Sequence, residues 1–192
     1  MSIDTLTSEP PEMVVLVHGA VTNGQETWQE QRPLSQDYAL VTPDRLGYGL
    51  GAPEAAEDPE ADAVTIGALL GQGAHLVGYS MGGMVAMLAA ARHPEAVKSL
   101  VLVEPVAFDL VRGREEMEDF IAGYEGLRAS SPDAETFLRG FLMFVGNDPA
   151  EVAQIPEPMP ESLHNAAVAL YTGAAPWDVP TPVEELAAAT FL

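Results

Sequence analysis

Cysteine and basic residues are what this sequence has least of. It contains no cysteine, which excludes disulfides, cysteine–zinc sites and thiol nucleophiles, and leaves the redox compartment undetermined. Lysine and arginine together number 8 against 29 aspartates and glutamates, which gives a formal net charge of −21. Because such a surface repels phosphate backbones and anionic lipid, we expect neither nucleic-acid binding nor membrane-surface binding.

Long hydrophobic runs are missing as well. No apolar stretch approaches the ~20 residues needed to cross a bilayer, and the amino-terminal letters MSIDTLTSEPPE are too acidic for a secretory signal. We therefore expect a soluble, cytoplasmic protein. No metal-ligand cluster, phosphate loop or cofactor motif occurs in the sequence, so we expect no metal and no cofactor. With 192 residues, 47% of them hydrophobic, the chain can build its own core.

The first half of the chain alternates between two kinds of apolar segment. Short runs rich in β-branched residues, typical of strands buried on both faces, occupy residues 13–17, 38–42, 74–79 and 99–103. Helix-like segments lie between them, at residues 26–36, 65–70 and 82–92, although Pro33 must start or break the first of these. This alternation predicts an α/β fold with a parallel sheet.

The pattern changes after Pro105. From residue 106 to 173 the apolar positions follow helical spacing, with a bend at IPEPMP, so we expect a helical insertion over the sheet. Its aromatic residues could line an apolar pocket, but their spacing favours a helix–helix core. A further helix is predicted from Thr181 as N-cap, with Pro182 in its first turn and Glu184 completing a capping box, to about Ala189.

The stretch AHLVGYSMGGM at residues 74–84 raises the question of a catalytic serine. Gly78-Tyr79-Ser80-Met81-Gly82 matches G-x-S-x-G, a motif that is weak when it stands alone. Here a buried strand leads in and a small-residue helix leads out, which is the setting of a nucleophile elbow. The alternative is a glycine-rich connection with an incidental serine, and the setting favours the nucleophile.

The end of the first strand offers a second part of such a site. Residues 18–20 read His18-Gly19-Ala20, where a loop amide could point to the space above Ser80. The backbone N–H groups of Ala20 and Met81 would then form an oxyanion hole. We interpret His18 as a structural residue that orients this loop rather than as the catalytic base.

Three stretches together resemble the α/β-hydrolase superfamily, in its serine-nucleophile branch with a helical cap. They are VVLVHGA, TPDRLGYG at 42–49 and the run from residue 74 to 105. The resemblance implies that residues 1–105 form the amino-terminal part of the hydrolase core, 106–179 the helical cap and 180–192 a core helix. Ser80 would be the nucleophile, Ala20 and Met81 the oxyanion donors, and His18, Gly19, Gly78 and Gly82 structural residues near the site.

The resemblance also implies an acid and a histidine further along the chain than Ser80. His93 lies about 13 residues beyond Ser80, some 20 Å along a helix, and His75 roughly 16 Å before it along a strand, so neither can be the base. His164 is interpreted as an ordinary cap histidine. Glu104, directly after the fourth strand, is kept as an alternative acid.

We therefore expect a sequence that stops before the last strands of its fold. An ester or related acyl substrate would be hydrolysed through an acyl-enzyme, but this chain alone would be inactive because its base is missing. One alternative is a non-catalytic relative that binds a small apolar ligand. Another is a chain completed by a partner or by self-association at the exposed fourth strand, residues 99–103.

Overall fold

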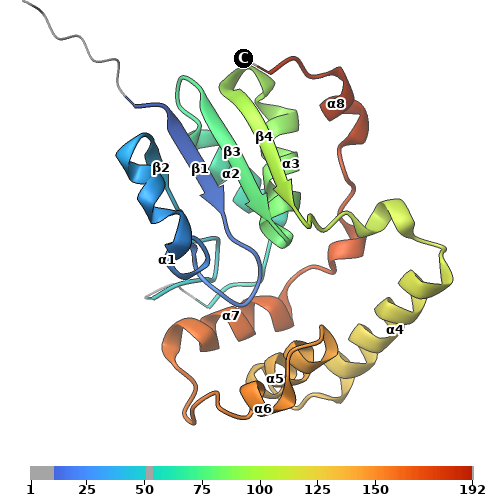
Figure 1. Cartoon of the computed structure of the whole chain (residues 1–192). Helices are drawn as coiled ribbons and strands as arrows, with labels where there is room; N and C mark the ends of the chain where they lie inside the picture. Colours follow the sequence, from blue (N-terminus) through green and yellow to red (C-terminus); the bar gives the residue numbers. More distant parts are fainter. Residues whose placement is uncertain (1–10, 51–53, 192) are drawn as a thin grey trace, which may run out of the picture.

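The structure is a computed structural model that describes residues 11–50 and 54–191. Its centre is a four-stranded sheet in the order β2-β1-β3-β4, and every neighbouring pair is parallel. The strands are β1 (Met13–Val17), β2 (Ala39–Val41), β3 (Ala74–Tyr79) and β4 (Val97–Val103). All four predicted strands are present, and the predicted parallel α/β architecture is confirmed (Figure 1).

Two helices cover one face of the sheet, α2 (Pro59–Leu69) and α3 (Met81–Arg92) (Figure 1). Helix α2 starts where Asp58 accepts hydrogen bonds from the N–H groups of Glu60 and Ala61, which would otherwise lack partners. Helix α3 is buried from Met81 to Ala90, and its small side chains allow it to lie close to the strands. These two helices and the inward side chains of the sheet form the main core.

The other face of the sheet is covered only in part. The predicted helix at residues 26–36 is instead a short α1 (Gly24–Thr27) followed by a 3-10 helix from Gln29 to Gln36. Pro33 lies inside this segment and has no N–H to donate, which is one reason why a regular α-helix does not form. Trp28 packs there on Val14 and Leu16 of β1.

Four helices form a layer beyond the carboxyl ends of the strands (Figure 1): α4 (Glu115–Ser130), α5 (Ala134–Phe144), α6 (Pro149–Val152) and α7 (Glu161–Thr172). The IPEPMP stretch connects α6 to α7. We call this layer, with the loops that join it, the cap. It has a core of its own, separate from that of the sheet, formed by Met117, Ile121, Tyr124, Phe137, Leu138, Met159, Ala167, Leu170 and Trp177.

The last helix, α8 (Val183–Ala188), differs from the prediction at its start. The Thr181 hydroxyl does not cap it, because it donates to Asp109 Oδ1 at 2.5 Å while the Thr181 N–H donates to Asp109 Oδ2 at 2.9 Å. Pro182 is the N-cap residue, so the predicted capping box was wrong. Among the helices in the described part of the chain, none combines the length and apolar character needed to span a bilayer.

Candidate active site

Ser80 lies at the tight turn between β3 and α3, in a backbone conformation that side chains rarely adopt. Its φ of 53° and ψ of −121° are strained for a residue with a Cβ. The surrounding backbone holds it there. The Ser80 N–H donates to the Val103 carbonyl at 3.0 Å, and the Ser80 carbonyl accepts from the N–H groups of Gly83 at 2.8 Å and Val106 at 3.2 Å.

The two glycines that flank Ser80 are required by close backbone contacts. A Cβ on Gly78 would lie 2.4 Å from the Gly82 carbonyl oxygen, and one on Gly82 would lie 2.3 Å from the carbonyl oxygen of His18. Contacts this short involve backbone atoms that cannot move aside. The G-x-S-x-G spacing therefore lets the start of α3 lie directly against the end of β1.

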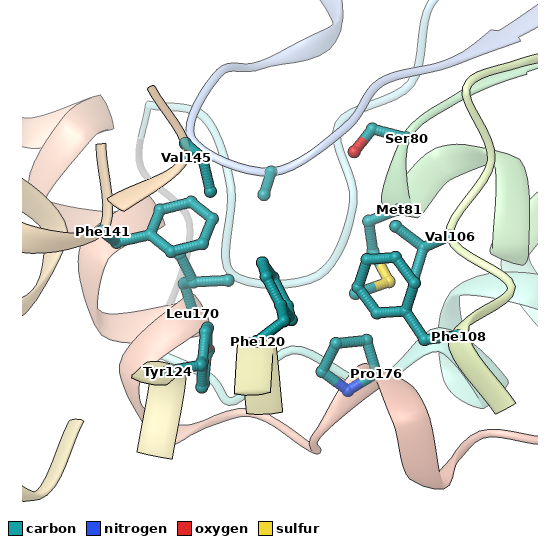
Figure 2. Close-up of a pocket in the computed structure, with 11 residues that line it drawn as sticks. Ser80, Met81, Val106, Phe108, Phe120, Tyr124, Phe141, Val145, Leu170 and Pro176 are labelled. Atoms are coloured by element: carbon teal, nitrogen blue, oxygen red, sulfur yellow. The ribbon is translucent and has the colours of Figure 1, made fainter. Parts of the chain in front are cut away.

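This contact brings the loop after β1 beside Ser80. A Cβ on Gly19 would be 3.0 Å from the Ser80 Cβ, and Ala20, Ser80 and Met81 line one cavity (Figure 2). Among the described residues, nothing accepts a hydrogen bond from the backbone N–H of Ala20 or of Met81. The structure thus brings the serine and both residues that the sequence points to around one cavity.

His18 is buried beneath this loop, and both of its ring nitrogens are engaged. Nε2 accepts the Arg45 backbone N–H at 2.9 Å, so the proton is on Nδ1, which donates to the Gly19 carbonyl at 2.7 Å. Burial, reinforced by the Arg45 charge, lowers the pKa of His18 to about 3. His18 is therefore neutral near pH 7 and has no free nitrogen for a proton from Ser80.

A buried ionic network lies next to His18 and joins the sheet to the cap. The Arg45 Nη2 contacts the Glu57 carboxylate, and its Nε donates to Asp62 Oδ2 at 3.0 Å. The Tyr48 hydroxyl donates to Glu57 Oε1 at 2.9 Å, and burial raises the pKa of this phenol well above its usual range. The Glu57 backbone in turn bonds to Ala169 of α7.

The sequence patterns did not point to Glu57 or Asp62. Both belong to an acidic stretch, EAAEDPEAD at residues 54–62, whose composition is typical of a solvated segment. Of this network, the sequence patterns include only Arg45 and Tyr48, which lie in the TPDRLGYG stretch at residues 42–49 that carries part of the family resemblance. The sole local signal is that Arg45 follows a strand and would need a counter-charge if buried.

The cavity beside Ser80 has a volume of about 130 Å³ and lies between the sheet and the cap (Figure 2). Its walls are mostly apolar, and two of its side chains carry hydroxyl groups, Ser80 and Tyr124. The expectation that the aromatic residues between 106 and 173 serve a helix–helix core was incomplete, since four of them also line this cavity. The apolar side chains that line it are Ala20, Met81, Val106, Phe108, Phe120, Phe141, Val145, Leu170 and Pro176.

No described residue supplies a base to Ser80. The four histidines of the chain have other partners, and Ser80 Oγ has no hydrogen-bond partner in the part of the chain that the structure describes. His75 bonds to Ser99 Oγ at 2.8 Å, and His164 bonds to Glu135 at 2.8 Å. His93 lies 3.8 Å from a Glu95 carboxylate oxygen.

Glu104, the alternative acid, follows β4 with a φ of 46°. Its side chain is exposed and is not among those that line the cavity. Its role as an acid stays a prediction, as do the catalytic roles of Ser80, Ala20 and Met81.

Comparisons with known proteins identify the family and the fold. A model of the alpha/beta hydrolase family matches residues 14–191. Lipase LipV of Mycobacterium tuberculosis is 34% identical over 130 residues, which cover 65% of this chain and 49% of the lipase. A pimeloyl-[acyl-carrier protein] methyl ester esterase of Chromobacterium violaceum is 34% identical over 101 residues, 53% of this chain and 39% of the esterase. The chain thus spans half or less of the length of these relatives.

Solved structures show the same fold. An esterase from Thermogutta terrifontis superposes with a TM-score of 0.61 at 22% identity, over 94% of this chain and 68% of the esterase. A lipase-esterase related protein from Clostridium acetobutylicum gives a TM-score of 0.63 at 18% identity, over 95% and 72% of the two chains.

Proposed function

Because this chain belongs to the alpha/beta hydrolase family, we propose that it carries the nucleophile and oxyanion hole of a carboxylic ester hydrolase. One observation carries the proposal. Ser80 occupies a strained turn at the start of a helix, with two unengaged backbone N–H groups beside it and an apolar cavity in front. Strain and unsatisfied donors cost free energy, so their presence together is best explained by a reaction that uses them.

The proposed chemistry is acyl transfer through Ser80. Its Oγ attacks the ester carbonyl, and the negative charge that develops on the carbonyl oxygen is stabilised by the N–H groups of Ala20 and Met81. The alcohol leaves, and water then hydrolyses the acyl-enzyme. Both steps require a base to accept a proton. Since no described histidine contacts Ser80, we propose that the 192-residue chain alone performs the first step very slowly.

The cavity favours a small hydrophobic group on one side of the ester. Its volume of about 130 Å³ is close to the ~150 Å³ of a cavity that holds one benzene molecule. The names of the relatives, a lipase and a methyl ester esterase, support an ester substrate for this chain too. We propose esters of short or singly branched acids or alcohols as its substrates.

A fluorophosphonate probe tests the role of Ser80 directly, because it reacts with activated serines. We expect slow labelling of the intact chain, with the label on Ser80 in a peptide map and no labelling of Ser80→Ala. Ser99→Ala is the matched control, since Ser99 is the serine bonded to a histidine, and it should label like the parent chain. Labelling that survives Ser80→Ala would contradict the role of Ser80. Rapid labelling that depends on Ser80 would contradict the proposal that the 192-residue chain alone reacts very slowly.

A second candidate function is the pairing of β4 with a strand of another chain. The observation that favours it is the open outer edge of β4. Within the described residues nothing pairs with this edge, and the side chains of Val101 and Val103 are 48% and 41% exposed. A second copy or a partner polypeptide that adds a strand would cover them. Light scattering tests this. Association that is lost in Val101→Lys supports the pairing, and a stable monomer at high concentration contradicts it.

A further inference from the structure

Tyr124 has an unusual position in the cavity. It lies on α4, its side chain is only 4% exposed, and it lines the cavity that Ser80 faces. Its hydroxyl has no hydrogen-bond partner among the residues that the structure describes. Trp28 Nε1 is the one buried side-chain polar atom in this part of the chain that lacks a partner, so the Tyr124 hydroxyl keeps some contact with solvent. A phenylalanine would fill the same space and make the same ring contacts. The hydroxyl therefore calls for an explanation other than packing.

The Tyr124 ring is held in place, so its hydroxyl cannot turn away to find a partner. Edge-to-face contacts surround the ring, with centroid separations of 5.2 Å to Trp177, 5.4 Å to Phe137 and 5.9 Å to Phe141. Such contacts fix both the position and the orientation of an aromatic side chain. The hydroxyl is thus presented in one place, which is what recognition of a ligand atom requires.

The hydroxyl also stays protonated at every pH at which the protein would work. Burial, with a smaller effect of the negative charge on Glu57, raises the pKa of Tyr124 to about 12. A neutral phenol donates a hydrogen bond through its proton and can accept one through its oxygen.

We propose that the Tyr124 hydroxyl donates a hydrogen bond to an oxygen atom of the substrate other than the ester group. Ser80 lies on the sheet side of the cavity and Tyr124 on the cap side, as Figure 2 shows. An ester carbonyl bound at Ser80 would thus direct the rest of its acyl or alcohol group towards Tyr124. The preferred substrates are short esters that carry a second oxygen acceptor, a ketone or an ether, along an otherwise apolar chain.

This preference follows from the chemistry of the cavity, whose walls are mostly apolar while the Tyr124 hydroxyl is polar. A purely alkyl group would satisfy the apolar walls but would leave the Tyr124 hydroxyl unpaired and without water. A group with a correctly placed carbonyl oxygen would satisfy both. Sites built to pair with a polar group discriminate against ligands that lack it, and we expect about tenfold tighter binding of the matching oxo-ester.

Binding to the intact 192-residue chain carrying Ser80→Ala tests this without turnover. The probes are methyl hexanoate and its 3-oxo, 4-oxo and 5-oxo derivatives, which have the same chain length and differ only in the added oxygen. Trp177 provides the readout, since its ring contacts Tyr124. Trp28, the other tryptophan of the chain, is replaced by phenylalanine so that fluorescence reports on the cavity alone.

We expect at least one oxo-ester to bind about tenfold more tightly than methyl hexanoate. We expect Tyr124→Phe to abolish this preference, with methyl hexanoate binding at least as tightly as it does to the chain with Tyr124. A preference that persists in Tyr124→Phe would overturn the proposal. So would equal binding of all four esters, or no binding of any oxo-ester up to its solubility limit.

A stability measurement separates recognition from a structural role. Tyr171→Phe is the matched control, because the Tyr171 hydroxyl donates to the Ser131 carbonyl at 3.1 Å. We expect Tyr171→Phe to lower the melting temperature and Tyr124→Phe to leave it unchanged or raise it. A large decrease for Tyr124→Phe would show that the hydroxyl serves the fold.

The proposal rests on the proposed ester hydrolysis for the class of ligand, but its test does not depend on a reactive Ser80. Failure of fluorophosphonate labelling with retained oxo-ester preference would refute the catalytic role alone. Normal labelling without that preference would refute the role of Tyr124 alone.

Discussion

Removal of the Glu57 carboxylate tests whether the buried network holds the sheet, the loop after β1 and the cap together. Glu57 accepts hydrogen bonds from the Arg45 guanidinium and from the Tyr48 hydroxyl, and all three side chains are buried. In Glu57→Ala both donors would remain in place without an acceptor, because Asp62 already pairs with Arg45 Nε and with the Leu46 N–H.

The expected loss of stability follows from these two orphaned donors. A buried donor left unpaired costs roughly 1–3 kcal/mol, and more when it is charged. Breaking a buried ion pair by removing one partner costs about 3–5 kcal/mol in proteins, which agrees with the added costs of the two unpaired donors. For a chain of this length each kcal/mol shifts the melting temperature by roughly 2–4 °C, so we expect a decrease of about 6–20 °C.

Glu60→Ala is the matched control, measured by urea and thermal unfolding side by side with Glu57→Ala. Glu60 also pairs with an arginine, Arg92, and lies only three residues further on, but the two side chains are 50% and 36% exposed. An exposed pair contributes at most about 1 kcal/mol. Equal losses for the two variants would refute the reasoning, since burial is the feature that distinguishes them.

The remaining predictions concern His18 and the elbow. Because the pKa of His18 falls from 6.5 to about 3 on folding, the unfolded state binds its proton first, and stability should decrease as the pH falls from about 6.5 towards 3. His18→Gln should reduce the dependence of the free energy of unfolding on pH in this range by up to about 1.4 kcal/mol per pH unit. An unchanged pH dependence, measured by unfolding at several pH values, would contradict this account of His18. Gly82→Ala should destabilise by more than about 3 kcal/mol and abolish labelling of Ser80, because its Cβ meets two carbonyl oxygens within 2.4 Å. Gly126→Ala, where a Cβ meets nothing within 4 Å, should instead stabilise by up to about 1 kcal/mol in the same unfolding experiment.

The strands and the elbow were predictable because their signals are local. Each strand is a run of β-branched residues between turn-forming residues, and a buried parallel strand has no other requirement. The elbow needs glycine two residues before and two residues after the serine because the backbones there approach within 2.4 Å of an added Cβ. The start of α8 shows the limit of such signals, since Thr181 has a capping sequence but bonds to Asp109, 72 residues away.

Thus the sequence by itself determined the parallel sheet, the family resemblance and the place of Ser80, all of which depend on spacing along the chain. Tertiary structure alone decided which polar groups are buried. Glu57 belongs to an acidic stretch, yet its carboxylate is buried and accepts a hydrogen bond from Tyr48. Tyr124 belongs to a helical apolar pattern, yet it lines the cavity beside Ser80. Burial of a polar group depends on what distant segments bring to it, and desolvation acts only once those segments meet.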